Sequence, residues 1–182
     1  ATWLYPQSPW RTVGRPFLAP FVMERFPLGT DTLGRNLASG LVHGARVSLM
    51  IGVVSTLVAL LIGVPLGAVA GYAGGFVDDA LMRFTEFFQT IPSFALAIVM
   101  VAILQPQLGS IVLAIGVVSW PPVARLVRGE VLSLRTREYV QAAVTIGQST
   151  PRIIFSQVLP NTLAPIIVMG SLMIGSAILL ES

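Results

Sequence analysis

The side chains best suited to bind another protein lie in a polar segment, residues 138–161, set between long apolar stretches. Glu138 is its first residue and Arg137 immediately precedes it, and both can form ion pairs with a partner. Ala142 and Ala143 follow one turn later, and their small side chains would give a helix a thin side that fits into a groove. These residue types point to docking rather than to catalysis.

Two short helices are expected within this segment. Residues 139–146 supply two turns of the first, and Gly147 ends it, because glycine readily adopts the left-handed conformation just past a helix. Thr150 is expected to cap the second helix, with Pro151 at its first position. Residues 159–161, Leu-Pro-Asn, are expected to break that helix. The residues fit equally well an amphipathic loop on the membrane surface, with arginines paired to lipid phosphates.

Other reactive groups are sparse in this chain. It has no cysteine and one histidine, His43, so a zinc site, which usually needs about four ligands, is not expected. It also has no lysine and no GxxxxGK[ST] phosphate-binding loop. We therefore expect a protein that is not an enzyme and that binds no cofactor of its own.

The composition is that of a membrane protein. Hydrophobic residues make up 54% of the 182 residues and charged residues 10%, whereas a soluble domain carries about 25% charged residues. The net charge of +3 comes from eleven arginines, no lysine and eight acids. The arginines lie between apolar stretches and do not alternate with aromatics, so we interpret them as membrane anchors and expect no nucleic-acid partner.

Four apolar stretches are long enough to cross a bilayer, which takes about 20 helical residues. They are residues 47–77, 83–104 with Pro92 inside, 108–126 with Pro121 and Pro122 inside, and 153–180 with a span starting near Thr162. Helices are expected because an open strand edge leaves backbone groups unpaired in lipid. The fold class is therefore an all-α, polytopic membrane protein.

Loop charges predict the orientation of the spans. The connection 105–109 is uncharged, whereas the longer loop, 127–160, carries four arginines. The positive-inside rule places this loop in the cytoplasm and residues 1–46 outside. Five arginines in residues 1–46 oppose this assignment, but long external segments obey the rule weakly. The chain then divides into an external segment that leads to the first span, 1–46, and a transmembrane domain, 47–182.

Several residues near or within the spans are expected to be structural. Gly63, Gly67 and Gly71 recur at four-residue spacing, which favours close helix packing over a role in substrate binding. The prolines inside the spans are expected to break helices and leave carbonyls unpaired. Residues 78–86 contain two aspartates, one arginine and one glutamate that can form i,i+4 pairs in a solvated cluster. Thr30 and Asp31 are expected to cap a helix in the external segment.

The spans also predict a longer protein. With a cytoplasmic N-terminus, one further span must precede the first residue, and the chain stops directly behind an apolar stretch. We therefore expect this chain to lack one helix at each end.

Three stretches in order resemble the permease subunits of the dipeptide, oligopeptide and nickel branch of ABC importers. They are LGTDTLGRNLASGLVHGARVSL at 28–49, AGYAGGFVDDALMRFTEFFQTIPSF at 70–94 and SWPPVARLVRGEVLSLRTREYVQAA at 119–143. Segment 138–161 resembles the cytoplasmic EAA loop of these permeases, in which a short helix docks into a groove on the ATP-hydrolysing subunit. Gln141 stands where many of them have glutamate, so the contact is either neutral here or made by Glu138, one turn earlier.

The resemblance implies a type I ABC-importer permease fold with four of six spans present, in the bacterial plasma (inner) membrane. It implies four kinds of partner: two ABC ATPase subunits that hold ATP and Mg, a second and different permease subunit, an external solute-binding protein, and membrane lipid. The chain would form half of the translocation path for peptides or a related small solute. The ATPase-coupling residues that the resemblance implies are Arg137, Glu138, Gln141, Ala142, Ala143, Gly147, Leu159 and Pro160.

The alternative is a membrane protein that works without an ATPase. A secondary transporter would be expected to carry ionisable residues inside its spans for ion coupling, and the interiors of the expected spans have none. A membrane scaffold subunit would not need a docking loop. The sequence identifies neither the solute nor the residues that would bind it.

Overall fold

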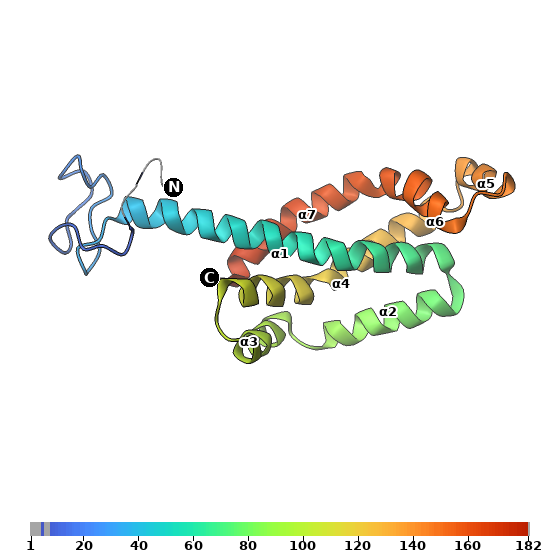
Figure 1. Cartoon of the computed structure of the whole chain (residues 1–182), viewed down its shortest axis with the longest axis horizontal. Coiled ribbons are helices and arrows are strands. Elements are labelled where there is room, and N and C mark those ends of the chain that lie inside the picture. The colour runs from blue at the N-terminus through green and yellow to red at the C-terminus, as the bar shows by residue number, and fades with distance from the viewer. Residues whose placement is uncertain (1–4, 6–7, 182) are drawn as a thin grey trace. The chain divides into compact units, whose positions relative to one another are not determined.

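In a computed structural model, the chain is helical through most of its length (Figure 1). The structure describes residues 5 and 8–181, so residues 1–4 and 6–7 of the expected external segment, and Ser182, lie outside it. The described residues form no β-strand, only isolated bridges such as that between Thr12 and Arg35. The all-α prediction is therefore confirmed. The chain divides into two compact units, Ala1–Met50 and Ile51–Ser182.

The first unit is rich in loops and leads into helix α1 (Leu37–Ala73). Asn36 caps this helix, because its Oδ1 accepts the backbone N–H groups of Ala38 at 3.0 Å and Ser39 at 3.4 Å. The prediction of a cap at Thr30 or Asp31 is wrong. The buried Thr30 hydroxyl instead accepts the backbone N–H of Leu18 and donates to the Arg15 carbonyl, which holds the preceding loop in place.

Asp31 orders the turn before the helix. Its Oδ1 accepts the backbone N–H groups of Arg35 and Leu33, both at 2.8 Å. These bonds, chiefly the one from Arg35, favour the charged carboxylate and hold the pKa of Asp31 below its usual value. The charged side chain therefore sets the approach to α1 without capping it.

The second unit contains the rest of α1 and all the later helices (Figure 1). These are α2 (Gly75–Thr90), α3 (Ser93–Leu104), α4 (Leu108–Leu134), α5 (Glu138–Thr145), α6 (Thr150–Ile153), the π-helix η1 (Ile154–Val158) and α7 (Leu159–Glu181).

Three helices of the described chain are long and apolar enough to cross a membrane, α1, α4 and the continuous run Thr150–Glu181. A fourth span is possible if α2 and α3 count as one, although they are bent by 82°. The bend falls at Pro92, because Ile91 before it is extended, as the residue before a proline usually is. α1 also begins ten residues earlier than the expected first span, because Asn36 starts the helix well before the charge-free stretch.

Helix α4 forms the centre of the second unit and contacts α2, α3 and α7. Its buried face supplies Trp120, Val123, Ala124, Val127 and Val131 to the core. The ring of Trp120 lies 5.9 Å from that of Phe84 and 5.5 Å from that of Phe88, which attaches α2 to α4 through aromatic contacts.

The glycine pattern of α1 packs this helix directly on α4, as predicted. A Cβ atom on Gly63 would lie 2.6 Å from the Val123 Cβ, and one on Gly71 would lie 2.7 Å from the Arg128 carbonyl oxygen. A Cβ on Gly67 would meet the backbone at Ala124. Small residues thus let the two backbones touch over two helical turns.

The paired prolines of α4 do not break it. The helix continues through Pro121 and Pro122 to Leu134, eight residues past the expected end of the span. Trp120, Pro121 and Val123 are buried, and this packing from neighbouring helices holds the helix together at the prolines.

Candidate functional site

The α5–α6 loop extends from the end of α4, and two arginines anchor its base: Arg128 of α4 to the start of α2, and Arg135, the C-cap of α4, to the end of α1. Arg128 forms a two-pronged ion pair with Asp78 of α2, with Nε to Oδ1 at 2.8 Å and Nη2 to Oδ2 at 2.6 Å. Arg135 donates from Nη1 to the last carbonyls of α1, Gly71 at 3.2 Å and Tyr72 at 3.3 Å. A cation at a helix C-terminus is favourable, because the free carbonyls there carry partial negative charge.

The predicted solvated cluster at residues 78–86 is therefore wrong for Asp78. Its side chain is buried, with only 6% of the residue exposed, and pairs with a different helix rather than with a neighbour four residues along α2. The i,i+4 spacing relates Asp79 to Arg83, whereas Asp78 has no basic residue four positions along α2. A buried carboxylate is stabilised far more by a planar guanidinium that satisfies both its oxygens.

Helix α5 begins where α4 ends. Arg137 is its N-cap residue, and its carbonyl accepts the N–H groups of Val140 at 3.0 Å and Gln141 at 3.1 Å. The Gln141 side chain turns back and donates from Nε2 to the carbonyl of Arg135 at 2.9 Å, which satisfies a carbonyl left free where α4 stops. Glu138 lies in the first turn, where a negative charge is favoured by the helix dipole.

Gly147 ends α5 in the left-handed conformation, as predicted, with φ at 80°. Its N–H donates to Val144 at 3.0 Å, and that of Gln148 reaches back to Ala143 at 3.1 Å, so the last carbonyls of the helix are satisfied. The cap of α6 is Ser149 rather than the predicted Thr150, which is already helical. Pro151 lies in the first turn of α6, where its missing N–H costs nothing.

Residues 159–161 do not break the helix, contrary to the prediction. The chain is helical from Thr150 to Glu181, because the π-helix η1 inserts a wider turn before Pro160. In this turn the N–H of Leu159 donates to the carbonyl of Ile154, five residues back. The Asn161 side chain donates to the Gln157 carbonyl at 2.6 Å in the same turn.

The two alanines of the EAA-like helix do not share one accessible face. Ala142 is exposed, but Ala143 is only 4% exposed and belongs to the core together with Val140, Ile153 and Val158. The expected thin side for insertion is therefore wrong for Ala143. Adjacent helical residues point about 100° apart, so one alanine packs inward and the other faces out.

A stripe of exposed residues on α5 and its C-terminal turn forms part of the accessible surface of the α5–α6 loop. The α5 stripe consists of Tyr139, Ala142 and Ile146, which the spacing of three and four residues places on one side of the helix. Ile146 is 74% exposed, the largest exposure of an aliphatic side chain in this loop. Tyr139 and Ile146 are not among the predicted site residues. An apolar side chain at the tip of a polar loop could have indicated a binding surface from the sequence.

The described residues also bear on the expectation about metal binding. They contain no group of three or more histidine, cysteine, aspartate or glutamate side chains placed to hold a metal. His43, in the first unit, has its Nδ1 at 3.0 Å from the Ser39 carbonyl oxygen. The arrangement at the α5–α6 loop presents an apolar stripe flanked by charges, which suits contact with a partner.

The helices and this loop define a multi-pass membrane protein with the type I permease fold of ABC importers. The structure is similar, with a TM-score of 0.69, to one described as inward facing conformations of the MetNI methionine ABC transporter. That similarity covers 78% of this chain and 71% of the other at 19% sequence identity, so it concerns the fold alone.

Sequence comparisons show the family. The family model for "binding-protein-dependent transport system inner membrane component" matches residues 63–182. The chain is 41% identical over 180 residues to the dipeptide transport system permease protein DppC of Bacillus subtilis, covering 92% of this chain and 56% of that protein. It is 43% identical over 185 residues to the di/tripeptide transport system permease protein DppC of Pseudomonas aeruginosa, covering 98% and 61%.

A third relative is the oligopeptide transport system permease protein OppC of Bacillus subtilis, 38% identical over 154 residues, with 85% of this chain and 50% of that protein covered. The chain thus belongs to the family of binding-protein-dependent transport system inner membrane components, within which it matches dipeptide and oligopeptide permeases. It spans about 56% of the length of the first of these relatives.

Proposed function

We propose that the protein is the transmembrane permease subunit of an ATP-driven ABC importer and forms half of a translocation path for peptides or a related small solute. The observation that carries this proposal is the α5–α6 loop, an exposed docking element tied to the core helices by Arg128 and Arg135. The names of the relatives support peptides as the solute class.

The loop is proposed to dock on an ABC ATPase through the α5 stripe. Ile146 would enter an apolar depression on the partner, since central buried side chains supply most of the binding free energy at interfaces. Arg137 and Glu138 would flank it with ionic contacts. Because the Gln141 amide group already donates within the chain, we assign to Glu138 the acidic contact that the resemblance to ABC-importer permeases implies for this helix.

The anchors explain how a movement of this loop would reach the membrane. Arg135 holds the end of α1 and Arg128 holds the start of α2, so a displacement of α5 would move the ends of three spans together. In this proposal the loop 127–160 is cytoplasmic and residues 1–46 are external, as the arginine distribution favours. The membrane would be the bacterial plasma membrane.

The complete system would also need two ATPase subunits carrying ATP and Mg, a second and different permease subunit, and an external solute-binding protein. This chain would bind no cofactor, and the remaining proposed coupling residues, Leu159 and Pro160, would return the loop to the membrane through η1.

The energy source that drives solute uptake distinguishes this proposal from a secondary transporter. The protein, purified with the subunits that accompany it from native membranes, is reconstituted in proteoliposomes and given radiolabelled trialanine. Uptake that requires hydrolysable ATP and survives ionophores is expected. Uptake that needs an ion gradient and ignores ATP would instead establish the secondary transporter, and the absence of any uptake would favour the scaffold.

A further inference from the structure

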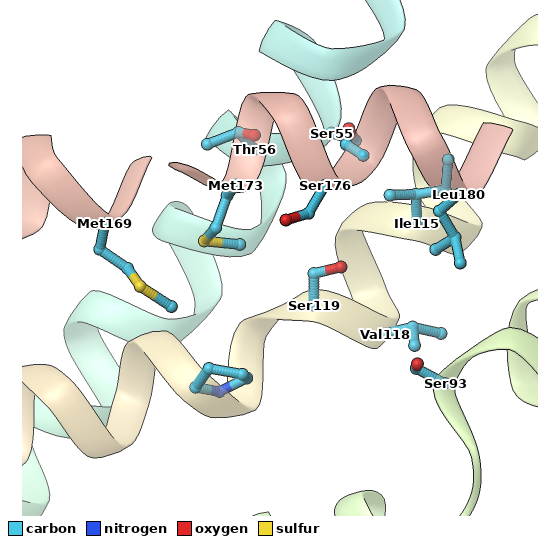
Figure 2. A pocket seen from close by; sticks show the side chains of 12 residues that line it. Ser55, Thr56, Ser93, Ile115, Val118, Ser119, Met169, Met173, Ser176 and Leu180 are labelled. Carbon is cyan, nitrogen blue, oxygen red and sulfur yellow. The ribbon is translucent and has the colours of Figure 1, made fainter. Parts of the chain in front are cut away.

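A cavity of about 290 Å³ lies inside the second unit, where α1, α3, α4 and α7 meet (Figure 2). Hydroxyl groups from all four helices line it: Ser55, Thr56, Ser93, Ser119 and Ser176. Figure 2 shows Met173 and Ser176 of α7 pointing towards Ser119 of α4 across the space. Its volume is at the lower end of the range of ligand pockets, about 300 Å³.

Among the described hydroxyl groups that line the cavity, that of Thr56 is buried without a hydrogen-bond partner. The residue is 4% exposed, and its Oγ1 has no hydrogen-bond partner among the described residues. Burying a hydroxyl without a hydrogen-bond partner destabilises the fold, so such groups are normally paired. A valine would fill the same volume without that cost. The unpaired Thr56 hydroxyl therefore lowers the stability of the fold, and a ligand in the cavity that forms a hydrogen bond with it would restore that stability.

Two other hydroxyls are held ready as acceptors. Ser55 donates to the Ile51 carbonyl at 2.6 Å, and Ser176 donates to the Leu172 carbonyl at 3.2 Å. Each has thereby used its only hydrogen, so its free lone pairs can accept a hydrogen bond from a ligand. Thr56 can donate as well as accept, which gives the cavity both kinds of hydrogen-bonding group.

The paired prolines add acceptors to the same wall. Pro121 and Pro122 have no N–H, so they cannot donate to the carbonyls of Val117 and Val118, four residues earlier. Val118, Ser119 and Pro122 line the cavity. The proline pair thus frees backbone oxygens next to the hydroxyls.

The chemistry of this wall selects an uncharged ligand. Among the described residues, no arginine, aspartate, glutamate or histidine lines the cavity, and a buried ammonium or carboxylate without a counter-charge is costly. Methionines 169 and 173 and other apolar side chains supply most of the remaining wall, and Met adapts easily to different shapes. A neutral group that both donates and accepts hydrogen bonds fits, which describes an amide.

We propose that this cavity is a transient binding site for one uncharged amide unit of the solute, with Thr56 as its main hydrogen-bonding contact. This inference rests on the proposed function. The site would hold a peptide unit within a single permease subunit. It would make no contact with the charged amino and carboxyl ends of the solute.

The first test changes Thr56 in the reconstituted transporter. For Thr56→Val, loss of one hydrogen bond is expected to raise the KM for trialanine about fivefold, whereas Thr56→Ser keeps the wild-type KM. The melting temperature of Thr56→Val should equal or exceed that of the wild type, because an unpaired buried hydroxyl is removed. The matched control is Thr85→Val, a buried threonine outside the cavity that bonds to the Leu81 carbonyl. A wild-type KM in a folded Thr56→Val transporter would overturn the proposal.

The second test measures occupancy without transport. The chain has no cysteine, so Ser119→Cys places a single thiol in the cavity, and Ser171→Cys places one on the exposed side of α7. Trialanine is expected to slow the reaction of a neutral methanethiosulfonate with the first thiol at least threefold and to leave the second unchanged. Equal rates with and without trialanine would contradict the site. Absence of wild-type trialanine uptake, by contrast, would sink the proposed function, and the labelling result would still report on the cavity.

Discussion

Asp78 and Arg128, fifty residues apart in the chain, form a two-pronged ion pair that joins the start of α2 to the C-terminal half of α4. Together with the bonds from Arg135 to the end of α1, this pair gives the α5–α6 loop a rigid base. A docking loop can transmit movement only if its base is fixed to the spans.

Removing one charge of the pair should destabilise the helical core. Asp78→Asn leaves the Arg128 guanidinium without its anion, and we expect a loss of about 2 kcal/mol in the free energy of unfolding, read as a lower melting temperature in detergent. Asp79→Asn is the matched control, because Asp79 is adjacent, exposed and makes no ion pair among the described residues. Equal losses in the two variants would show that the pair contributes nothing specific.

The contact between α1 and α4 should not tolerate a methyl group. A Cβ at Gly67 would meet the backbone of α4, so Gly67→Ala is expected to cost about 1–3 kcal/mol and to reduce the yield of folded protein. Gly129→Ala serves as the control, because no atom lies within 4 Å of its added Cβ and alanine favours a helix. A Gly67→Ala protein as stable as the wild type would contradict the close packing.

Ile146 should matter for coupling and not for folding. Since its side chain is largely exposed, Ile146→Ala should leave the melting temperature unchanged while weakening ATPase binding about tenfold, a typical effect for a central interface residue. Leu172→Ala, at a similarly exposed position on α7, should affect neither quantity. The measurement is the affinity of each variant for the ATPase subunit, determined by titration in detergent. Unaltered affinity in Ile146→Ala would remove this residue from the interface.

The turn after α5 should depend on the backbone conformation of Gly147. At a φ of 80°, a β-branched residue is strained, so Gly147→Val is expected to shift the turn and to lower ATP-driven uptake more than ATP hydrolysis. Gly147→Asn should retain most uptake, because asparagine tolerates the left-handed region. The ratio of solute transported to ATP hydrolysed is the measurement. Identical ratios for the two variants would argue against a role of the turn in coupling.

Local rules predicted part of this structure correctly. The end of α5 at Gly147 and the packing of Gly63, Gly67 and Gly71 depend on short-range conformation and on residue size, which can be read along the chain. The partner of Asp78 could not be read in this way, because it lies fifty residues away and a nearer arginine offered a plausible pair.

The errors in the loop have similar causes. Pro160 is a reliable helix breaker by local rules, but a π-turn absorbs it when the flanking helix is held by its neighbours. Ala143 is small enough for an interface and equally for a core, and only the fold shows that it packs with Val158. The unpaired Thr56 hydroxyl is likewise visible only once four helices enclose it.

The most direct test of the account is a cross-link from the exposed alanine of α5 in native membranes. A single cysteine at Ala142, in the otherwise cysteine-free chain, is coupled to a short cross-linker, and the captured protein is identified by mass spectrometry. The buried position provides the control, Ala143→Cys, which should react poorly. We predict capture of an ABC ATPase subunit, with a yield that changes on addition of ATP. A correctly inserted Ala142→Cys protein that captures no ATPase would contradict the central claim.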